Sequence, residues 1–323
     1  MIIRSIVIGL GKIGMDYDYD DSSKSFIATH VKALILHPNF ELVGVVDSNT
    51  DRRSRFNKKY NISAYERIED LPKKSKIDVV IIATNTKDHF DSFVKIVENF
   101  KPHLILCEKP LSPNIQKSRE MIDLAKSANI NLAVNYIRQY DAGFRTLINR
   151  INVGEIGFPI KSCIWYRKGI YNNASHMINL LSSMLGEVLD VDIISHGRVF
   201  DGWDPEPDLK IKFDKGEVIL LSGNEEDYSY GQMEIYGPSG KVLLDKDGNL
   251  FLWKTEKNKM FNGYVVLESK PESIQTDTGR YQFNVLENIS DFFINNGKIY
   301  CDGELGLETM EILNLITVKL NEE

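Results

Sequence analysis

The chain begins with the feature that most restricts its fold: an apolar run, Ile2–Ile8, leads directly into the glycine-rich sequence Gly9–Gly14. Such a run predicts a buried strand, and glycines in a G-x-G-x-x-G pattern predict the tight turn that follows it. In a dinucleotide-binding turn the first glycine permits the bend. The second lets the backbone approach a pyrophosphate, and the third allows close packing of helix on strand. The motif alone is equally compatible with a glycine-rich turn that binds nothing.

Asp47 supports the dinucleotide interpretation, because it ends a second apolar run, Glu41–Val46. An acid at the tip of the second strand accepts hydrogen bonds from the adenosine ribose and repels a 2′-phosphate, which favours NAD over NADP. Asp47 lies well past the usual interval of about 20 residues after the glycines. The extra length is Met15–Ser25, an acidic, tyrosine-bearing segment without helical periodicity.

We interpret Met15–Ser25 as a loop inserted before the first helix. A loop in solvent is the simpler interpretation and the one we favour, and a lid near cofactor or substrate is the alternative. The helix that follows is expected at Phe26–His37, because a residue before proline disfavours helix and Pro38 comes next.

Length and charge exclude several classes. A chain of 323 residues can bury a large core and usually divides into two domains. Its formal net charge of −7 argues against nucleic-acid binding. Cys107, Cys163 and Cys301 are odd in number and far apart, which predicts neither a disulfide framework nor a metal site and fits a cytoplasmic protein. No apolar stretch approaches the ~18 residues of a membrane span.

Short apolar runs alternate with amphipathic stretches in the first part of the chain, which predicts an α/β Rossmann domain with a doubly wound parallel sheet at residues 1–130. Strands are expected at Ile2–Ile8, Leu42–Val46, Val79–Ala83, Leu104–Cys107 and Asn131–Val134. Further helices are expected at Arg52–Tyr60, Lys87–Asn99 and Asn114–Ala128. Ligands bind such sheets beyond the carboxyl ends of the strands, so chemistry is expected in the segments that follow each strand.

The pattern changes further along the chain. Alternating runs such as Lys210–Phe213 and Gly216–Leu221 are separated by turn signals at 214–216, 237–240 and 247–249. They predict a C-terminal α+β domain at residues 131–323, built on an open, largely antiparallel sheet. Helices near Asn284–Asn295 and Glu304–Leu320 complete it, and the boundary is placed no better than residues 130–150.

Further motifs reveal a resemblance. Leu106–Leu111, which contains Glu108-Lys109-Pro110, and the turn Ala83–Thr86 with His89 join the opening glycines in resembling the Gfo/Idh/MocA oxidoreductase family. The segments Asn135–Arg138 and Gly154–Gly157 look like that family's link into its second domain. Asn172–Asn179 looks like its active-site helix. The resemblance covers nearly the whole chain.

The resemblance implies an NAD-dependent enzyme that transfers a hydride between nicotinamide and a sugar or polyol carbon. Lys109 would hydrogen-bond the reacting hydroxyl and share in proton transfer, and His176 would act as general base. Glu108 and Pro110 would hold Lys109 in place, through a peptide bond that is cis in one interpretation. The residues implied for cofactor binding are Gly9, Gly11, Lys12, Ile13, Gly14, Asp47, Thr84, Asn85, Thr86, His89, Glu108 and Lys109. No metal is implied.

His176 also has a purely structural interpretation, since Met177, Leu180, Leu181, Met184 and Leu185 form an apolar stripe that is simply core. However, His176, Asn179 and Ser183 fall together beside that stripe, and Asn172 extends the group. A polar strip of this kind predicts a lined cleft.

Two asparagines depart from the family pattern. Many members carry aspartates where this chain has Asn172 and Asn179, and asparagine accepts no proton at neutral pH. His176 would then serve with Lys109 alone, or another acid replaces the aspartate. Asp204, Glu206 and Asp208 are conceivable replacements.

Tyrosines and cations gather near the start of the second domain. In the functional interpretation they bind substrate, and arginine suits a diphosphate or carboxylate because its planar fork bonds two oxygens. Ordinary surface charge and strand aromatics are the alternative. The substrate-binding residues we expect are Tyr136, Arg138, Lys168, Asn172 and Asn179.

Three functions remain open. The first is an NAD-dependent sugar dehydrogenase, with a nucleotide sugar of surface-glycan synthesis as one candidate substrate. The second is a dehydrogenase of a free polyol or inositol. The third is an NAD-binding regulator without catalysis. A homodimer or homotetramer is expected, because an open sheet must bury its uncovered face.

Overall fold

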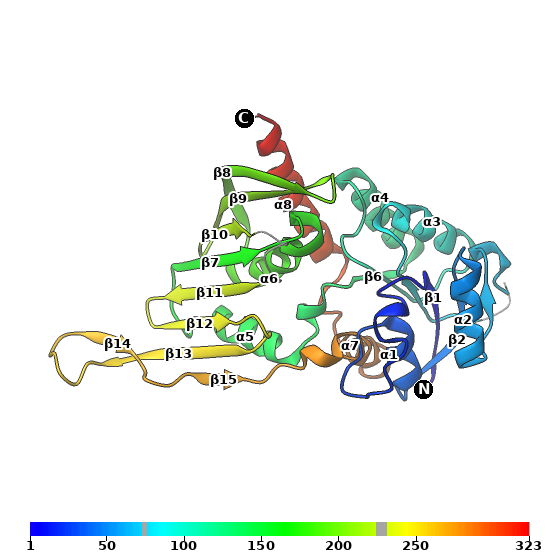
Figure 1. Ribbon diagram of the computed structural model, residues 1–323, viewed down its shortest axis with the longest axis horizontal. Coiled ribbons are helices and arrows are strands. Elements are labelled where there is room, and N and C mark those ends of the chain that lie inside the picture. Colours follow the sequence, from blue (N-terminus) through cyan, green and yellow to red (C-terminus); the bar gives the residue numbers. More distant parts are fainter. Residues whose placement is uncertain (73–75, 224–230, 323) are drawn as a thin grey trace. The chain divides into compact units, whose positions relative to one another are not determined.

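The computed structural model describes residues 1–72, 76–223 and 231–322. Contacts between residues divide the chain into two compact units, whose elements are labelled in Figure 1. Unit 1 comprises Met1–Tyr140 and Gly279–Met310, and unit 2 comprises Asp141–Thr278 and the chain from Glu311 onward.

Unit 1 is built on a six-stranded sheet in which every pair of neighbouring strands is parallel. The strands are β1 (Ile3–Ile8), β2 (Phe40–Val46), β3 (Ala64–Tyr65), β4 (Val79–Ile82), β5 (Leu104–Cys107) and β6 (Asn131–Val134). Their order, β3-β2-β1-β4-β5-β6, is that of a doubly wound dinucleotide-binding sheet and confirms the predicted fold class. The strand order reverses between β1 and β4, which is where such folds bind ligands.

Helices cover both faces of this sheet, and for this reason its central strands are continuous apolar runs: every residue of β4 and β5 is buried. The helices are α1 (His30–Leu36), α2 (Thr50–Tyr60), α3 (His89–Asn99), α4 (Ile115–Ala128) and α7 (Tyr281–Asn295). Short 3₁₀ segments are η1 (Asp16–Asp18), η2 (Ile68–Asp70), η3 (Thr86–Asp88), η4 (Ile137–Gln139) and η6 (Thr278–Arg280).

The first helix starts later than the predicted residue 26, because α1 begins at His30. Thr29 caps this helix, with an extended backbone (φ −117°, ψ 152°) and a side chain that accepts a hydrogen bond from an amide of the first turn. The buried carboxylate of Asp18 accepts hydrogen bonds from the amides of Ala28 and Thr29, at 2.7 and 3.0 Å. The inserted segment therefore sets the start of α1.

The C-terminal part of the chain returns to unit 1. Asn39, which precedes β2, donates a hydrogen bond to Ser290 of α7 at 2.8 Å. The Val134 amide of β6 donates to the Cys301 carbonyl at 2.9 Å. The units therefore do not follow the predicted division into 1–130 and 131–323, because β6 completes the parallel sheet and residues 279–310 pack against it.

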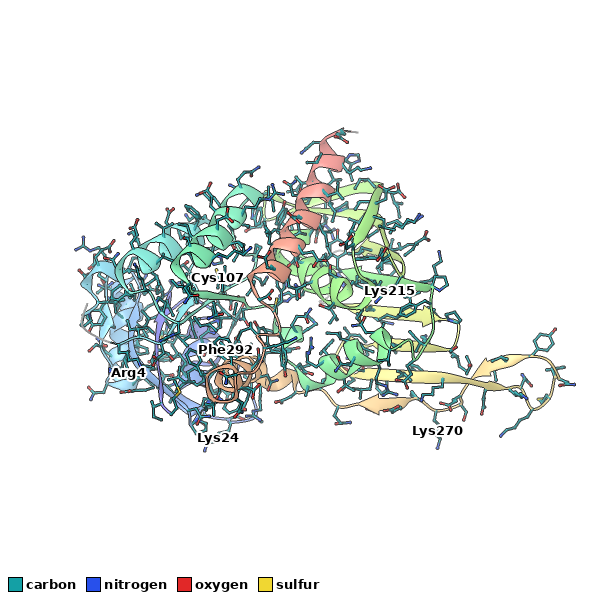
Figure 2. All side chains as sticks on the ribbon, turned by 180° about the vertical axis from the view of Figure 1, so that it is seen from behind. Arg4, Lys24, Cys107, Lys215, Lys270 and Phe292 are labelled. Carbon is teal, nitrogen blue, oxygen red and sulfur yellow. The ribbon has the colours of Figure 1, made fainter. Side chains whose placement is uncertain are left out.

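Unit 2 holds a mixed nine-stranded sheet, ordered β14-β13-β12-β11-β7-β10-β9-β8, with β15 paired to β13. Its strands are β7 (Ile160–Tyr166), β8 (Val188–Phe200), β9 (Asp204–Phe213), β10 (Gly216–Ser222), β11 (Gln232–Gly237), β12 (Gly240–Leu244), β13 (Leu250–Lys257), β14 (Val265–Leu267) and β15 (Glu272–Ile274). Only β7 and β10 pair in parallel among the pairs described, which confirms the predicted, largely antiparallel sheet. Lys270, in the turn between β14 and β15, is labelled in Figure 2.

One face of this sheet is covered and the other is open. Along β7 the side chains of Ile160, Ile164 and Tyr166 are buried, whereas Lys161 and Trp165 are exposed. The helical elements of unit 2 are α5 (Ala142–Asn152), the π-helical turn η5 (Ile170–Ala174), α6 (Ser175–Leu185) and the end of α8 (Gly303–Glu322). In the described residues, no helix combines the length and the apolar character needed to cross a membrane.

Candidate active site

The glycine-rich turn after β1 is shaped by close backbone contacts. Gly9 has a φ of 98°, which glycine adopts readily, and a side chain there would collide with the backbone of Ala83 after β4. A side chain on Gly14 would overlap the Gly9 carbonyl. A Cβ on Gly11, by contrast, would meet no atom within 4 Å. Gly9 and Gly14 therefore form the turn, and Gly11 leaves its outer side accessible.

Asp47 follows β2 directly and is fixed by the backbone around it. Its Oδ2 accepts a hydrogen bond from the Leu10 amide at 2.6 Å, and its Oδ1 accepts one from the Asn49 amide at 2.8 Å. The guanidinium of Arg52, in the first turn of α2, lies 3.6 Å from Oδ2. The acid at the tip of the second strand is thus tied to the glycine-rich turn itself.

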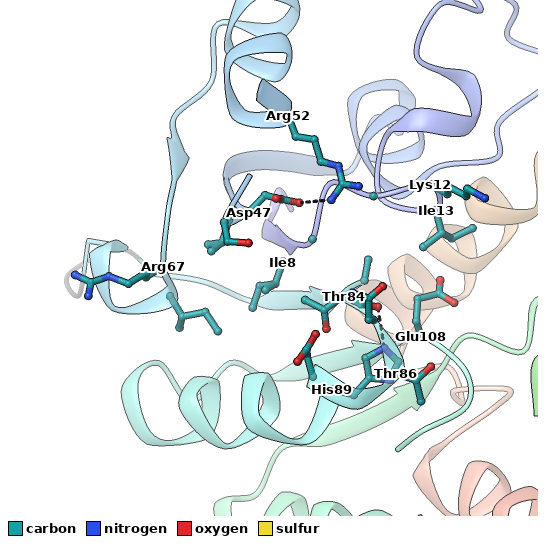
Figure 3. Close-up of a pocket in the computed structure, with 18 of the residues that line it drawn as sticks. Ile8, Lys12, Ile13, Asp47, Arg52, Arg67, Thr84, Thr86, His89 and Glu108 are labelled. Atoms are coloured by element: carbon teal, nitrogen blue, oxygen red, sulfur yellow. Dashed lines mark hydrogen bonds and ion pairs between the residues drawn. The ribbon is translucent and has the colours of Figure 1, made fainter. Parts of the chain in front are cut away.

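These groups line one pocket of about 860 Å³ in unit 1, shown in Figure 3. The predicted cofactor residues that line it are Gly9, Gly11, Lys12, Ile13, Asp47, Thr84, Asn85, Thr86, His89, Glu108 and Lys109. Gly14 is buried beneath the turn and is not part of the lining. The volume is typical of a pocket that binds a small molecule or cofactor.

His89 joins two of the loops that form the pocket. Its Nδ1 lies 3.0 Å from the Pro110 carbonyl, and its Nε2 lies 3.2 Å from the Thr84 carbonyl. Burial lowers the pKa of His89, so the neutral ring prevails and donates to one of these carbonyls at a time. The side chain thereby links the segments that follow β4 and β5.

Glu108 is a buried carboxylate in the wall of the pocket. His30 Nε2 lies 2.7 Å from its Oε1, and Asn135 donates to the same oxygen at 2.5 Å. Asn135 also donates to Gln282 of α7 at 3.0 Å. Burial alone would raise the pKa of Glu108, but the hydrogen bonds and charge of His30, with Asn135 and the Lys109 charge, outweigh it and lower that pKa. Glu108 is therefore an anion at neutral pH.

Lys109 follows this anion and lines the same pocket. Its side chain is half-buried, and its backbone amide donates to Glu108 Oε2 at 3.3 Å. The Lys109–Pro110 peptide bond is cis, as the resemblance had allowed. Figure 2 shows Cys107, at the end of β5, immediately before this turn.

The predicted polar strip lies on η5 and α6 of unit 2. His176 is half-buried in the first turn of α6, and Asn179 is fully buried one turn later. Asn172 is half-buried in η5. The predicted apolar stripe, from Met177 to Leu185, is buried core.

Two buried carboxylates anchor the chain that leads into α6. Asp204 accepts hydrogen bonds from the amides of Tyr171 and Asn172, at 3.0 and 2.9 Å. Glu206 accepts one from the Gly169 amide at 3.1 Å and one from Arg198 at 2.6 Å. The acids considered from sequence as partners of His176 thus hold the backbone before its helix, while Asp208 accepts hydrogen bonds from Ser222 instead.

The predicted substrate-binding residues divide between the units. Tyr136 is buried and Arg138 is half-buried, both just after β6 in unit 1, and neither lines the pocket. Lys168, Asn172 and Asn179 belong to unit 2. The roles of all five stay predictions.

Several lining residues were missed by sequence reasoning, among them Tyr17, Ser48, Arg52, Arg67 and Lys95. Arg52 carried a usable signal, because the first turn of a helix after the strand that ends in Asp47 faces the same loop. Ser48 directly follows Asp47. Tyr17, Arg67 and Lys95 come from the inserted segment, the start of η2 and α3, whose approach to the pocket depends on tertiary packing.

The pocket fits a dinucleotide on two observations. Thr84 Oγ1 is buried in it and has no hydrogen-bond partner in the described part of the chain. Gly11 leaves open space beside the turn, because a Cβ there would meet no atom within 4 Å, so that a pyrophosphate could approach the backbone. Within the described ranges, no group of three or more His, Cys, Asp or Glu side chains could hold a metal ion.

Comparisons with known proteins point to the same class of protein as the pocket does. A family model described as the oxidoreductase family with an NAD-binding Rossmann fold, GFO_IDH_MocA, matches residues 3–136. The scyllo-inositol 2-dehydrogenase (NAD(+)) of Bacillus subtilis is 28% identical over 75% of this chain and 73% of its own. The myo-inositol 2-dehydrogenase of Thermotoga maritima is 24% identical over 75% of each chain.

Among solved structures, the WlbA dehydrogenase from Bordetella pertussis, in complex with NADH and UDP-GlcNAcA, has the same fold. It superposes with a TM-score of 0.77 at 14% identity, over 99% of this chain and 97% of that one. Fold and site together define an NAD-binding oxidoreductase. Residues 3–136 match the Gfo/Idh/MocA family model, and the inositol dehydrogenases above are similar over three quarters of the chain.

Proposed function

We propose that this protein is a dehydrogenase that transfers a hydride between NAD and a hydroxyl-bearing ring carbon of a sugar or cyclic polyol. The observation that carries the proposal is Lys109, a cation on an ordered turn in the wall of the pocket that also holds Gly11 and Asp47. A cation there can bind a substrate hydroxyl beside a dinucleotide and stabilise the negative charge that develops on its oxygen.

Different residues of unit 1 bind the cofactor, bind the substrate hydroxyl and hold the turn between them. The glycine-rich turn and Asp47 would hold NAD, which would supply the hydride acceptor. The Lys109 ammonium donates a hydrogen bond to the reacting hydroxyl. Glu108, held by His30 and Asn135, fixes the turn that carries Lys109.

His176 is the proposed general base, as the family resemblance implies. A neutral imidazole accepts the proton that the hydroxyl loses during oxidation. Because Asn172 and Asn179 accept no proton, no relay of carboxylate and histidine operates at these positions. Asp204 fixes the backbone before this helix by accepting hydrogen bonds from the amides of Tyr171 and Asn172.

Two substrate classes have support. Relatives named inositol dehydrogenases favour a free cyclic polyol. The fold neighbour solved with UDP-GlcNAcA, together with the cations Arg138 and Lys168, favours a nucleotide sugar. Competition separates them, because an enzyme for a free polyol has no reason to bind UDP.

The test mixes the protein and excess NAD with inositols, free sugars, UDP-hexosamines and UDP-uronates and follows NADH fluorescence. The proposal expects a signal with one class, at least a hundredfold lower in Lys109→Met and unchanged in Lys24→Met, which alters an exposed lysine. Silence across the panel, with NAD shown to bind, would contradict a dehydrogenase of these substrates and favour a regulator.

Self-association through the open sheet face of unit 2 is part of the proposal. Trp165, Ile219 and Tyr236 are exposed on β7, β10 and β11, with exposed fractions of 42%, 40% and 45%. A symmetric homodimer or homotetramer would bury them. Light scattering should give twice or four times the 36.9 kDa chain mass, and Trp165→Asp should reduce it.

A further inference from the structure

Arg52 stands beside the acid that selects NAD. Its Nη1 lies 3.6 Å from Asp47 Oδ2, and it lines the pocket (Figure 3). An arginine near this strand end matters, because NADP-binding folds use one to hold the 2′-phosphate that NAD lacks. The adenosine end of the pocket therefore holds one group that repels a 2′-phosphate and one that would attract it.

Asp16 approaches the same arginine from the inserted segment. Its Oδ2 lies 3.8 Å from Arg52 Nε, and its Oδ1 accepts a hydrogen bond from Arg55 Nη1 at 2.9 Å. Its side chain is only 27% exposed. Asp16 and Asp47 thus hold Arg52 between two carboxylates, and Asp16 also neutralises Arg55.

The segment that carries Asp16 is built onto the cofactor turn rather than extended into solvent. The Asp16 amide donates to the Gly11 carbonyl at 3.1 Å. Tyr19 donates from its hydroxyl to the Arg55 carbonyl at 3.0 Å, and the Arg55 guanidinium lies 4.2 Å from the Tyr19 ring. The buried Asp18 bonds the start of α1. The predicted loop in solvent is therefore wrong for Asp16, Asp18 and Tyr19, whereas Tyr17 is exposed as predicted.

We propose that Asp16 is a second selectivity residue for NAD. By neutralising Arg52 and Arg55, it withholds from a 2′-phosphate the two cations that would otherwise favour it. The inserted segment thereby increases the preference for NAD over NADP that Asp47 already provides. The inference rests on the use of this pocket for NAD and is independent of which sugar or polyol is oxidised.

The size of the effect follows from electrostatics. Removing one negative charge from beside Arg52, at a partly solvated site, changes the affinity for a phosphate dianion by about three- to tenfold at physiological salt. NAD, which has a hydroxyl at this position, should respond by less than twofold.

The test measures the dissociation constants of NAD and NADP by titration calorimetry at one ionic strength. Asp16→Asn should lower the ratio of the NADP constant to the NAD constant by three- to tenfold. Asp20→Asn is the matched control, since it removes the same charge from an exposed position in the same segment. It should leave the ratio within twofold. Circular dichroism and thermal unfolding confirm that each variant is folded.

A double-mutant cycle tests whether Asp16 affects NADP binding through Arg52. If Asp16 acts mainly through Arg52, the change caused by Asp16→Asn should shrink by at least half in an Arg52→Gln background. An unchanged ratio in Asp16→Asn, or an equal change in Asp20→Asn, would overturn the proposal. Failure of the unchanged protein to bind either dinucleotide would overturn it together with the proposed function. Binding without turnover of any sugar or polyol would count against the proposed function alone.

Discussion

At the residue scale, Glu108 is a buried carboxylate whose charge is stabilised by neighbouring polar and charged groups. Its carboxylate is buried against His30 and Asn135, and these groups, with the Lys109 charge, lower its pKa despite burial. An ion pair in this setting is weak evidence for stability as such, but removing one partner leaves the other buried and unpaired.

Glu108→Gln should therefore lower the free energy of unfolding by about 3 kcal/mol. Urea denaturation at pH 7 measures it. Glu98→Gln, at an exposed position of α3, should change it by less than about 0.5 kcal/mol. A loss below about 1 kcal/mol in Glu108→Gln would show that His30 and Asn135 find other partners.

His176→Ala should separate catalysis from cofactor binding. The residues that line the NAD pocket all belong to unit 1, and His176 belongs to unit 2. We expect kcat to fall by about 10²–10⁴-fold, the usual contribution of a general base. Calorimetry should show an NAD dissociation constant within twofold of the unchanged value. Weakened NAD binding would contradict the assigned role.

At the scale of elements, the start of α6 depends on a glycine packed against a carboxylate. Gly169 has a φ of 78°, and a Cβ there would overlap the Asp204 carboxylate, which holds the amides of Tyr171 and Asn172. Any larger residue must displace Asp204 or the backbone that Asp204 caps. The orientation of the helix that carries His176 is therefore coupled to β9.

Gly169→Ala should lower stability by about 3 kcal/mol or more and reduce kcat, since it adds a steric clash to the strain of a positive φ. Gly202→Ala is a matched control. Its φ is 75°, but its Cβ would meet no atom within 4 Å, so it should cost only about 1–2 kcal/mol. Thermal unfolding and steady-state kinetics measure both. Equal losses in the two variants would mean that the Asp204 contact is unimportant.

At the scale of the whole molecule, the sequence predicted strands and contiguous motifs correctly, but it did not predict contacts between residues far apart in the chain. The strand at Leu104–Cys107 and the segments after each strand were found because periodicity and contiguous motifs encode them. The return of α7 to unit 1 was not, since the hydrogen bond between Asn135 and Gln282 joins residues 147 positions apart. Arg67 and Lys95 were missed for the same reason: the packing of η2 and α3, rather than a motif, places them in the pocket wall.

The stability of the whole chain in acid depends in part on a cluster of ion pairs around Arg150. Arg150 of α5 forms charged hydrogen bonds with Glu155 at 2.5 and 2.7 Å and with Glu272 of β15 at 2.7 Å. Lys254 of β13 lies 2.9 Å from Glu155. The hydrogen bond with Arg150 lowers the pKa of Glu155 from 4.5 to about 2. This cluster ties one helix to two strands of unit 2.

Because the folded pKa of Glu155 lies below its unfolded value, its contribution is complete above about pH 4.5 and is lost as pH falls toward 2. Allowing for partial solvent screening, Glu155→Gln should lower the free energy of unfolding by about 2 kcal/mol at pH 7. Thermal melts from pH 7 to pH 2.5 should show the two proteins converging in the acid range, since protonation removes from the unchanged chain what the substitution has already removed. A constant difference across that range would mean that packing of the side chain, and not its charge, supplies the stabilisation.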